Sequence, residues 1–295
     1  MSELRAGRHA PGLVGAIFGI MTHIYSLAYL TAPMAPPDAL ALAGKIGYQA
    51  IGVRIAPAAP GGDFSPLATE PAMLRETIRR MADTGVRVFD VEIARIGPQF
   101  DVDSSASFLE TAAVLNARAM LVAGDDPEEP RLTDSFASLC RKAAPYGITA
   151  NLEFMPWTAV KDVKTALRIV TNANQPNGRV LVDTLHAARS TTTLEEVARL
   201  PRQLLSYAQL CDAPADIPAT DDGLIHTARC ARLLPGDGGI DLVRLVQALP
   251  ADLPFSLEIP NVEWLAGVGP EEWARRALAA TRGIVARATG PITPD

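Results

Sequence analysis

The sequence is poor in the residues that soft metals and disulfide scaffolds require. It holds 3 Cys and 4 His in 295 residues, and the cysteines at positions 140, 211 and 230 form no CxxC pair. This odd, widely spaced set excludes a disulfide framework and a cysteine-rich zinc site, and it favours a reducing compartment. So few histidines also argue against a site built mainly from imidazoles. We therefore expect a cytoplasmic protein.

Basic charge is scarce as well. Lys and Arg total 27 against 33 Asp and Glu, which gives a formal net charge of −6. Because binding to nucleic-acid phosphates needs a basic surface, this balance argues against nucleic acid as the main partner. The patterns GxGxxG, GxxxxGK and HExxH are absent, so neither a Rossmann dinucleotide site, a P-loop nor a zincin site is expected.

One long apolar run lies near the N-terminus, at residues 12–30. Its length would suit a membrane span, but glycines and the polar residues Thr22, His23 and Ser26 interrupt it. No clean small-residue cleavage site follows, so an export signal is not favoured either. We expect the second half of the run to be a buried strand, residues 1–20 to be an N-terminal extension, and no membrane contact.

Downstream, short apolar runs alternate with amphipathic segments. The runs that predict strands are 23–30, 50–55, 86–93, 119–123, 149–154, 180–183, 205–210 and 254–259. The first two helical segments end at Gly47 and Gly85, as C-capped helices do. Nearly continuous hydrophobic strands that alternate with helices predict a parallel sheet, either a closed (β/α)8 barrel or an open doubly wound sheet.

Two features favour the barrel: the units repeat without a halfway break, and polar residues interrupt the strands at their C-terminal ends, where barrel sites are built. We expect a single-domain TIM barrel over residues 21–288 and a C-terminal tail over residues 289–295. The longest irregular stretch is predicted at residues 211–239, and loops of that length are usually functional or mobile.

Polar side chains end the last four predicted strands: Glu153, Asp183, Gln209 and Glu258. A lone acidic residue at a strand end is commonly a helix cap or a salt-bridge partner. Four such residues on consecutive strands would instead converge at one barrel mouth, where three carboxylates repel one another unless a cation neutralises them. Their hard oxygen donors predict one divalent metal, Mn²⁺ or Mg²⁺, with Co²⁺ and Zn²⁺ as alternatives.

Five segments carry a family resemblance: NLEFMPW (151–157), LVDTLHAARS (181–190), YAQLCDAP (207–214), ARLLPGDGGIDL (231–242) and SLEIPN (256–261). Through them, about residues 22–288 resemble the xylose isomerase-like TIM barrels. These barrels include sugar isomerases and epimerases, hydroxypyruvate isomerases, inosose and dehydroshikimate dehydratases, and endonuclease IV. The endonuclease branch fits poorly, because it uses several metals and more histidine ligands.

The resemblance implies that Glu153, Asp183, Gln209 and Glu258 hold one divalent metal. Many epimerases carry His at the place of Gln209, whereas Gln is seen in relatives similar to hydroxypyruvate isomerases and dehydratases. Gln keeps an oxygen ligand but removes a titratable group. This departure favours those two branches without choosing between them.

Further residues are implied in substrate binding. His186 of the DxxH segment is expected in the loop that follows the predicted strand 180–183. By resemblance, it contacts a substrate oxygen, and Arg229 or Arg232 reaches a substrate hydroxyl, carboxylate or phosphate. The alternatives are a helix-capping histidine and a solvated helix face. Arg54 and Glu92 end the second and third predicted strands, so they either contact substrate or form a structural ion pair. Trp157 either walls the pocket or packs under a loop.

These residues predict proton transfer next to a carbonyl. A divalent metal would polarise the carbonyl, and Glu153 and Glu258 would remove and return the proton. We expect a metal-dependent isomerase or epimerase acting on a small sugar or hydroxy-keto acid. The alternatives are a metal-dependent dehydratase of the dehydroshikimate or inosose type and a non-catalytic barrel. The expected partner is a small polyol or keto acid, and assembly into a homo-oligomer stays open.

Overall fold

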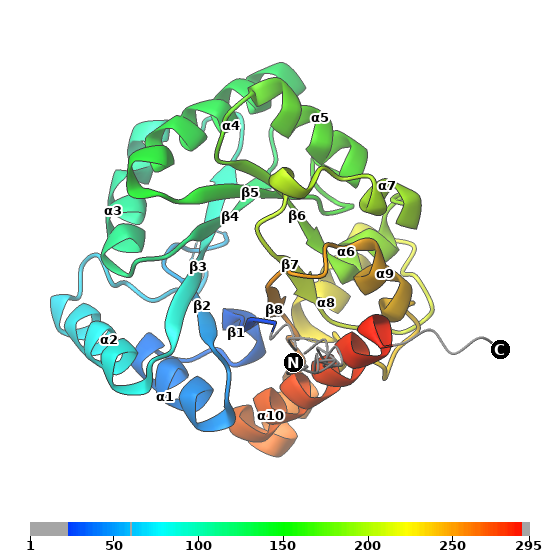
Figure 1. Ribbon diagram of the computed structural model, residues 1–295. Coiled ribbons are helices and arrows are strands. Elements are labelled where there is room, and N and C mark those ends of the chain that lie inside the picture. The colour runs from blue at the N-terminus through cyan, green and yellow to red at the C-terminus, as the bar shows by residue number, and fades with distance from the viewer. Residues whose placement is uncertain (1–22, 60, 291–295) are drawn as a thin grey trace, which may run out of the picture.

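The strands close into a barrel. The computed structural model describes residues 23–59 and 61–290, in which eight parallel strands follow one another in sequence order (Figure 1). They are β1 (Tyr25–Leu27), β2 (Ala50–Arg54), β3 (Arg87–Ile96), β4 (Ala119–Gly124), β5 (Thr149–Glu153), β6 (Gly178–Asp183), β7 (Ala208–Leu210) and β8 (Phe255–Leu257). Because β1 pairs with both β2 and β8, the ring is complete. The predicted (β/α)8 barrel is confirmed.

Helices surround the strands on the outside of this ring (Figure 1). They are α1 (Pro36–Ile46), α2 (Pro71–Thr84), α3 (Ala106–Val114), α4 (Glu129–Ala143), α5 (Val163–Ala173), α6 (Thr184–Arg189), α7 (Leu194–Ala198), α8 (Asp221–Cys230), α9 (Leu242–Ala248) and α10 (Val262–Thr289), with 3-10 turns η1 (Tyr29–Thr31), η2 (Val102–Ser105), η3 (Ala144–Tyr146) and η4 (Arg202–Leu204). The predicted caps Gly47 and Gly85 are both left-handed, with φ of 100° and 71°.

The prediction of one irregular stretch over residues 211–239 is wrong in its middle, because α8 occupies Asp221–Cys230. The side chain of Thr220 accepts a hydrogen bond from the Gly223 amide and so caps this helix. The sequence signal was weak because the helix is short and carries Gly223 in its first turn, where glycine lowers helix propensity.

The apolar core has two parts that leave one end of the barrel polar. The larger part fills the space between strands and helices, as expected for a sheet covered on its outer face. A smaller plug lies inside the ring and comprises Ile93, Ala119, Leu121, Ala123, Met155, Leu181 and Tyr207. The polar strand ends thus line the C-terminal mouth, where barrel enzymes carry their sites.

Two sequence expectations concern the N-terminal extension and contact with membranes. The predicted N-terminal extension, residues 1–20, lies outside the described residues. Among residues 23–59 and 61–290, no helix is both long enough and apolar enough to span a bilayer.

Candidate functional site

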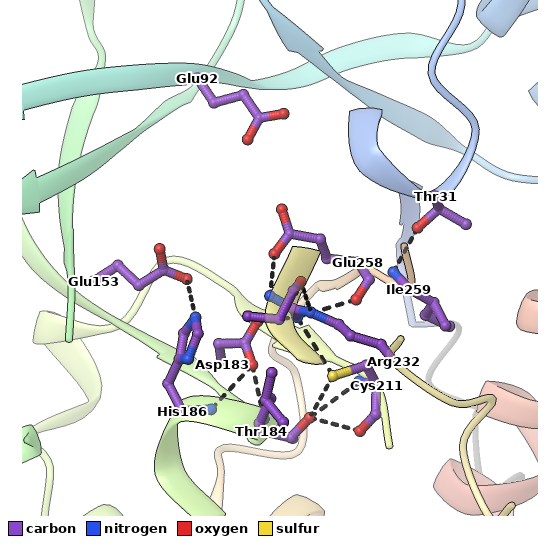
Figure 2. Close-up of polar contacts among 12 residues, drawn as sticks. Thr31, Glu92, Glu153, Asp183, Thr184, His186, Cys211, Arg232, Glu258 and Ile259 are labelled. Carbon is purple, nitrogen blue, oxygen red and sulfur yellow. Dashed lines mark hydrogen bonds and ion pairs between the residues drawn. The ribbon is translucent and has the colours of Figure 1, made fainter. Parts of the chain in front are cut away.

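A cavity of about 60 Å³ opens at the C-terminal mouth of the barrel. The predicted proton-transfer and substrate residues all line it: Arg54, Glu92, Glu153, Trp157, His186, Arg229, Arg232 and Glu258. Figure 2 shows that Glu92, Glu153 and Glu258 turn toward a common space. The two remaining predicted residues, Asp183 and Gln209, are 0% and 1% exposed and contact the lining from beneath.

Asp183 ends β6 and joins two parts of the site. Its Oδ1 accepts hydrogen bonds from the amides of Leu185 at 2.7 Å and His186 at 3.3 Å, which caps α6. Its Oδ2 accepts a hydrogen bond from Nη1 of Arg232 at 2.6 Å. Burial alone would raise the pKa of Asp183, but the Arg232 guanidinium and the hydrogen bonds hold this pKa below its usual value.

Glu258 follows β8 and forms the other end of this ion-pair network. Nη2 of Arg232 lies 2.9 Å from its Oε2, and Nη1 donates to its backbone carbonyl at 3.1 Å. Burial raises the pKa of Glu258 to about 7. The Arg232 guanidinium lowers this pKa, and the carboxylates of Glu92 and Asp183 raise it further. This carboxyl therefore holds a proton more readily than an exposed glutamate does.

Glu153 and His186 face each other across the cavity floor. Nε2 of His186 lies 3.8 Å from Oε1 of Glu153 (Figure 2). The ring of His186 packs edge-on against Trp157, with centroids 5.1 Å apart. Burial, with repulsion from Glu258 and Asp183, raises the pKa of Glu153 well above its usual value. Burial lowers the pKa of His186 to about 4, so the imidazole is neutral at pH 7. Its buried Nδ1 has no protein partner.

His186 lies within α6 rather than in a loop, because the helix begins directly after β6. No residue lies between β6, which ends at Asp183, and α6, which begins at Thr184. Asp183 is therefore both the last residue of the strand and the cap of the helix. Trp157 lines the cavity, which is the first of its two predicted positions, and it packs edge-on against His186 of α6.

Arg54 and Glu92 form an ion pair that itself faces the cavity. Nη2 of Arg54 lies 3.3 Å from Oε2 of Glu92, and its guanidinium stacks 4.9 Å from the ring centre of Tyr29. Nε of Arg54 and Oε1 of Glu92 are buried without a partner. Both therefore keep hydrogen-bonding capacity for a bound molecule. Arg229 is exposed on α8 at the cavity rim.

The donor set fits a hard cation. Ligand atoms of Glu153, Asp183 and His186 all lie within 4.8 Å of one another. The side-chain amide of Gln209 can point either way. With its nitrogen toward the site, it donates to Oε1 of Glu153 at 2.7 Å and to Oδ2 of Asp183 at 3.2 Å. With its oxygen toward the site, that oxygen faces these two carboxylate oxygens. A cation would stabilise the second arrangement, because each of these oxygens would then be a ligand. The structure thus adds His186 as a candidate ligand beside the four predicted residues.

Several buried polar residues in the barrel were not predicted. Asp90 lies on β3 two residues before Glu92, and burial, with repulsion from Glu92, raises its pKa well above the usual value. Polar atoms of Ser26, Asp90, Tyr207 and Ser256 are buried without a protein partner. The two-residue period of a strand places Asp90 on the face of Glu92, and this spacing could have identified it.

Arg95 is another cavity residue that was not predicted. It follows Glu92 by an odd number of residues, so a regular strand would place the two on opposite faces. The register of β3 against β4 shifts between Val91 and Ala94, and this irregularity brings both side chains to the cavity. The strand also continues to Ile96, beyond the expected end at residue 93.

Asp212 organises the loop that holds Arg232. Its carboxylate accepts hydrogen bonds at 2.9–3.1 Å from loop amides, those of Gly236, Gly238 and Ile240. Its backbone also bridges to Leu233. Because Leu233 directly follows Arg232, this anchored loop fixes the direction from which the guanidinium enters the site.

Gly238 is a sensitive point of this loop. A Cβ at this position would collide with the backbone oxygen of Ala213 and with Oδ1 of Asp212. We expect Gly238→Ala to lower the free energy of unfolding by about 1–3 kcal/mol, the usual cost of overpacking. Gly267→Ala on α10 is the matched control, because its Cβ would meet open space. Urea unfolding measures both, and equal midpoints would contradict the assigned role of the loop.

Comparison with known proteins places this barrel in a family. The model of the xylose isomerase-like TIM barrel matches residues 40–284. A 3-dehydroshikimate dehydratase of Pseudomonas aeruginosa is 30% identical over 145 residues, which is 48% of this chain and 22% of that protein. The chain therefore spans about a fifth of the length of this curated relative.

Solved structures share the fold. The IolI protein with a bound zinc atom has a TM-score of 0.74 at 19% identity, over 90% of this chain and 99% of that one. D-Psicose 3-epimerase of Clostridium cellulolyticum H10 has a TM-score of 0.66 at 13% identity, over 88% and 99%. Because the family model covers most of the chain, the protein belongs to the xylose isomerase-like TIM barrel family.

Proposed function

We propose that the protein is a divalent-metal-dependent isomerase or epimerase that moves a proton next to a carbonyl of a small sugar or hydroxy-keto acid. One observation carries the proposal: Glu153 and Glu258, both almost fully buried, face one small cavity from different strands (Figure 2). Asp183 and Gln209 lie beneath them with further oxygen donors. Isomerisation needs one group that removes a proton and one that returns it.

The site residues divide the chemistry between them. Glu153, Asp183, Gln209 and Glu258 would hold the metal ion, which when bound supplies Lewis acidity to the substrate carbonyl and its neighbouring hydroxyl. Glu153 and Glu258, buried carboxylates that line the cavity, accept and return the proton. His186, whose Nε2 faces Glu153 at the cavity, would contact a substrate oxygen.

The proposal predicts that activity and C–H exchange depend on the metal. After EDTA treatment and dialysis, we expect the protein to lose exchange of substrate hydrogen with D₂O, and added Mn²⁺ to restore it. NMR of a panel of keto-sugars and hydroxy-keto acids, including hydroxypyruvate, follows exchange and product together. Full exchange activity in protein that elemental analysis shows to be free of metal would contradict the proposal. Absence of both metal binding and turnover would favour the non-catalytic barrel.

A dehydratase is the second candidate. The similarity to the 3-dehydroshikimate dehydratase of Pseudomonas aeruginosa supports it. Both reactions begin with removal of a proton beside a carbonyl, and they differ in whether a β-hydroxyl then leaves. Ultraviolet absorbance of an unsaturated product from 3-dehydroshikimate or an inosose would identify the dehydratase. Exchange of the substrate hydrogen without loss of water would identify the isomerase.

A further inference from the structure

The guanidinium of Arg232 lies between two of the proposed metal ligands. Nη1 contacts Oδ2 of Asp183 at 2.6 Å and Nη2 contacts Oε2 of Glu258 at 2.9 Å (Figure 2). Nε donates to the carbonyl of Ala228 at 2.8 Å, and the side chain is only 3% exposed. A cation this deeply buried is stabilised by the carboxylates beside it rather than by water.

The backbone holds Arg232 in this place. Its amide donates to the carbonyl of Pro260 at 3.0 Å, and its carbonyl accepts from Nδ2 of Asn261 at 2.9 Å. Both partners lie between β8 and α10, just after Glu258. The segment is therefore tied to the strand end that carries one of the two carboxylates, so Arg232 is a built-in part of the site.

The same carboxylates attract two cations. Glu153, Asp183 and Glu258 are all buried, and in the absence of a metal their mutual repulsion is countered directly by Arg232. A divalent ion would bring two positive charges to these oxygens and would repel the guanidinium at short range. Arg232 and the metal thus compete for Asp183 and Glu258.

We propose that Arg232 is a placeholder cation, which orders Asp183 and Glu258 in the metal-free protein and whose contact with Glu258 loosens when the metal binds. The proposal rests on the metal site of the proposed function. It makes Arg232 a positioning residue for the ligands, in addition to the substrate contact that the family resemblance implies. Within the described part of the chain, Arg229, which lines the same cavity, pairs with neither carboxylate and has no such role.

Calorimetric titration of Mn²⁺ into EDTA-stripped full-length protein tests the proposal, with the melting temperature of the stripped protein as a second readout. We expect Arg232→Met to bind Mn²⁺ at least about tenfold more tightly, because one repelling charge is gone. We also expect its metal-free melting temperature to fall by roughly 6–15 °C, since two buried carboxylates lose their partner. Arg168→Met, the control, removes an exposed arginine that pairs with Glu129 on the outer surface of the barrel, and it should change neither quantity.

Unchanged or weaker Mn²⁺ binding by Arg232→Met would overturn the proposal. If this variant folds only when Mn²⁺ is present, the placeholder role is supported, because the metal then replaces the missing cation. If this variant does not fold at all, Arg232→Lys tests the proposal instead. A single ammonium group contacts the two carboxylates less well than a guanidinium does, so the lysine variant should bind Mn²⁺ more tightly than the wild type. Wild-type protein that binds no metal would refute the proposed function, whereas metal binding that is indifferent to Arg232 would refute only this inference.

Discussion

Glu153→Gln and Glu258→Gln are each expected to lower kcat by at least about 10³-fold at saturating Mn²⁺. General acid–base catalysis contributes about 10²–10⁴-fold, and each substitution also weakens a proposed metal ligand. Both side chains are buried at the cavity, with 3% and 5% exposure. Gln preserves the shape of the side chain but can neither accept nor return the proton.

The two variants should also differ from each other. If one carboxylate removes the proton and the other returns it, the variant that lacks the second keeps slow C–H exchange with D₂O while losing product. Glu129→Gln is the control, because this glutamate pairs with Arg168 on the outer surface of the barrel. A near wild-type rate in either site variant, with Mn²⁺ bound, would rule out the two-carboxylate mechanism.

The barrel was predictable because its strands are buried on both faces. The run Ala119–Ala123 is continuous and apolar, the run Val180–Val182 is too, and the paired strands occur where these runs do. The helix α8 was not predictable, since it begins with Asp221, Asp222 and Gly223, a composition shared with loops.

The convergence of the site was predictable for residues at strand ends, because parallel strands carry their last residues to one mouth. Glu153 at the end of β5 and Glu258 just after β8 both reach the cavity there. The placement of Arg95 was not predictable, since it depends on a register shift that no periodicity encodes. Nor was the pairing of Arg232 with Asp183, which lies 49 residues earlier in the chain and is brought near by the closed ring.

Asp183→Asn is expected to weaken Mn²⁺ binding by at least about 100-fold and to lower the free energy of unfolding by about 3–5 kcal/mol. The first effect follows because a proposed charged ligand becomes neutral. The second follows because Arg232, 2% exposed, keeps its charge but loses its closest partner, and breaking a buried ion pair costs this much. Asn still caps α6, so the helix itself should remain.

Asp126→Asn is the control that separates the loss of a metal ligand from the loss of a buried carboxylate. Asp126 is also 0% exposed and also accepts hydrogen bonds from a backbone amide, that of Glu128, and from an arginine, Arg131. Arg131 is half exposed, however, so water can solvate it once its partner is neutral. We expect a loss of about 1 kcal/mol and no change in Mn²⁺ affinity. Calorimetric metal titration and urea unfolding of both variants measure the contrast. Equal metal affinities in the two would remove Asp183 from the ligand set, because each substitution neutralises one carboxylate and Asp126 does not line the cavity.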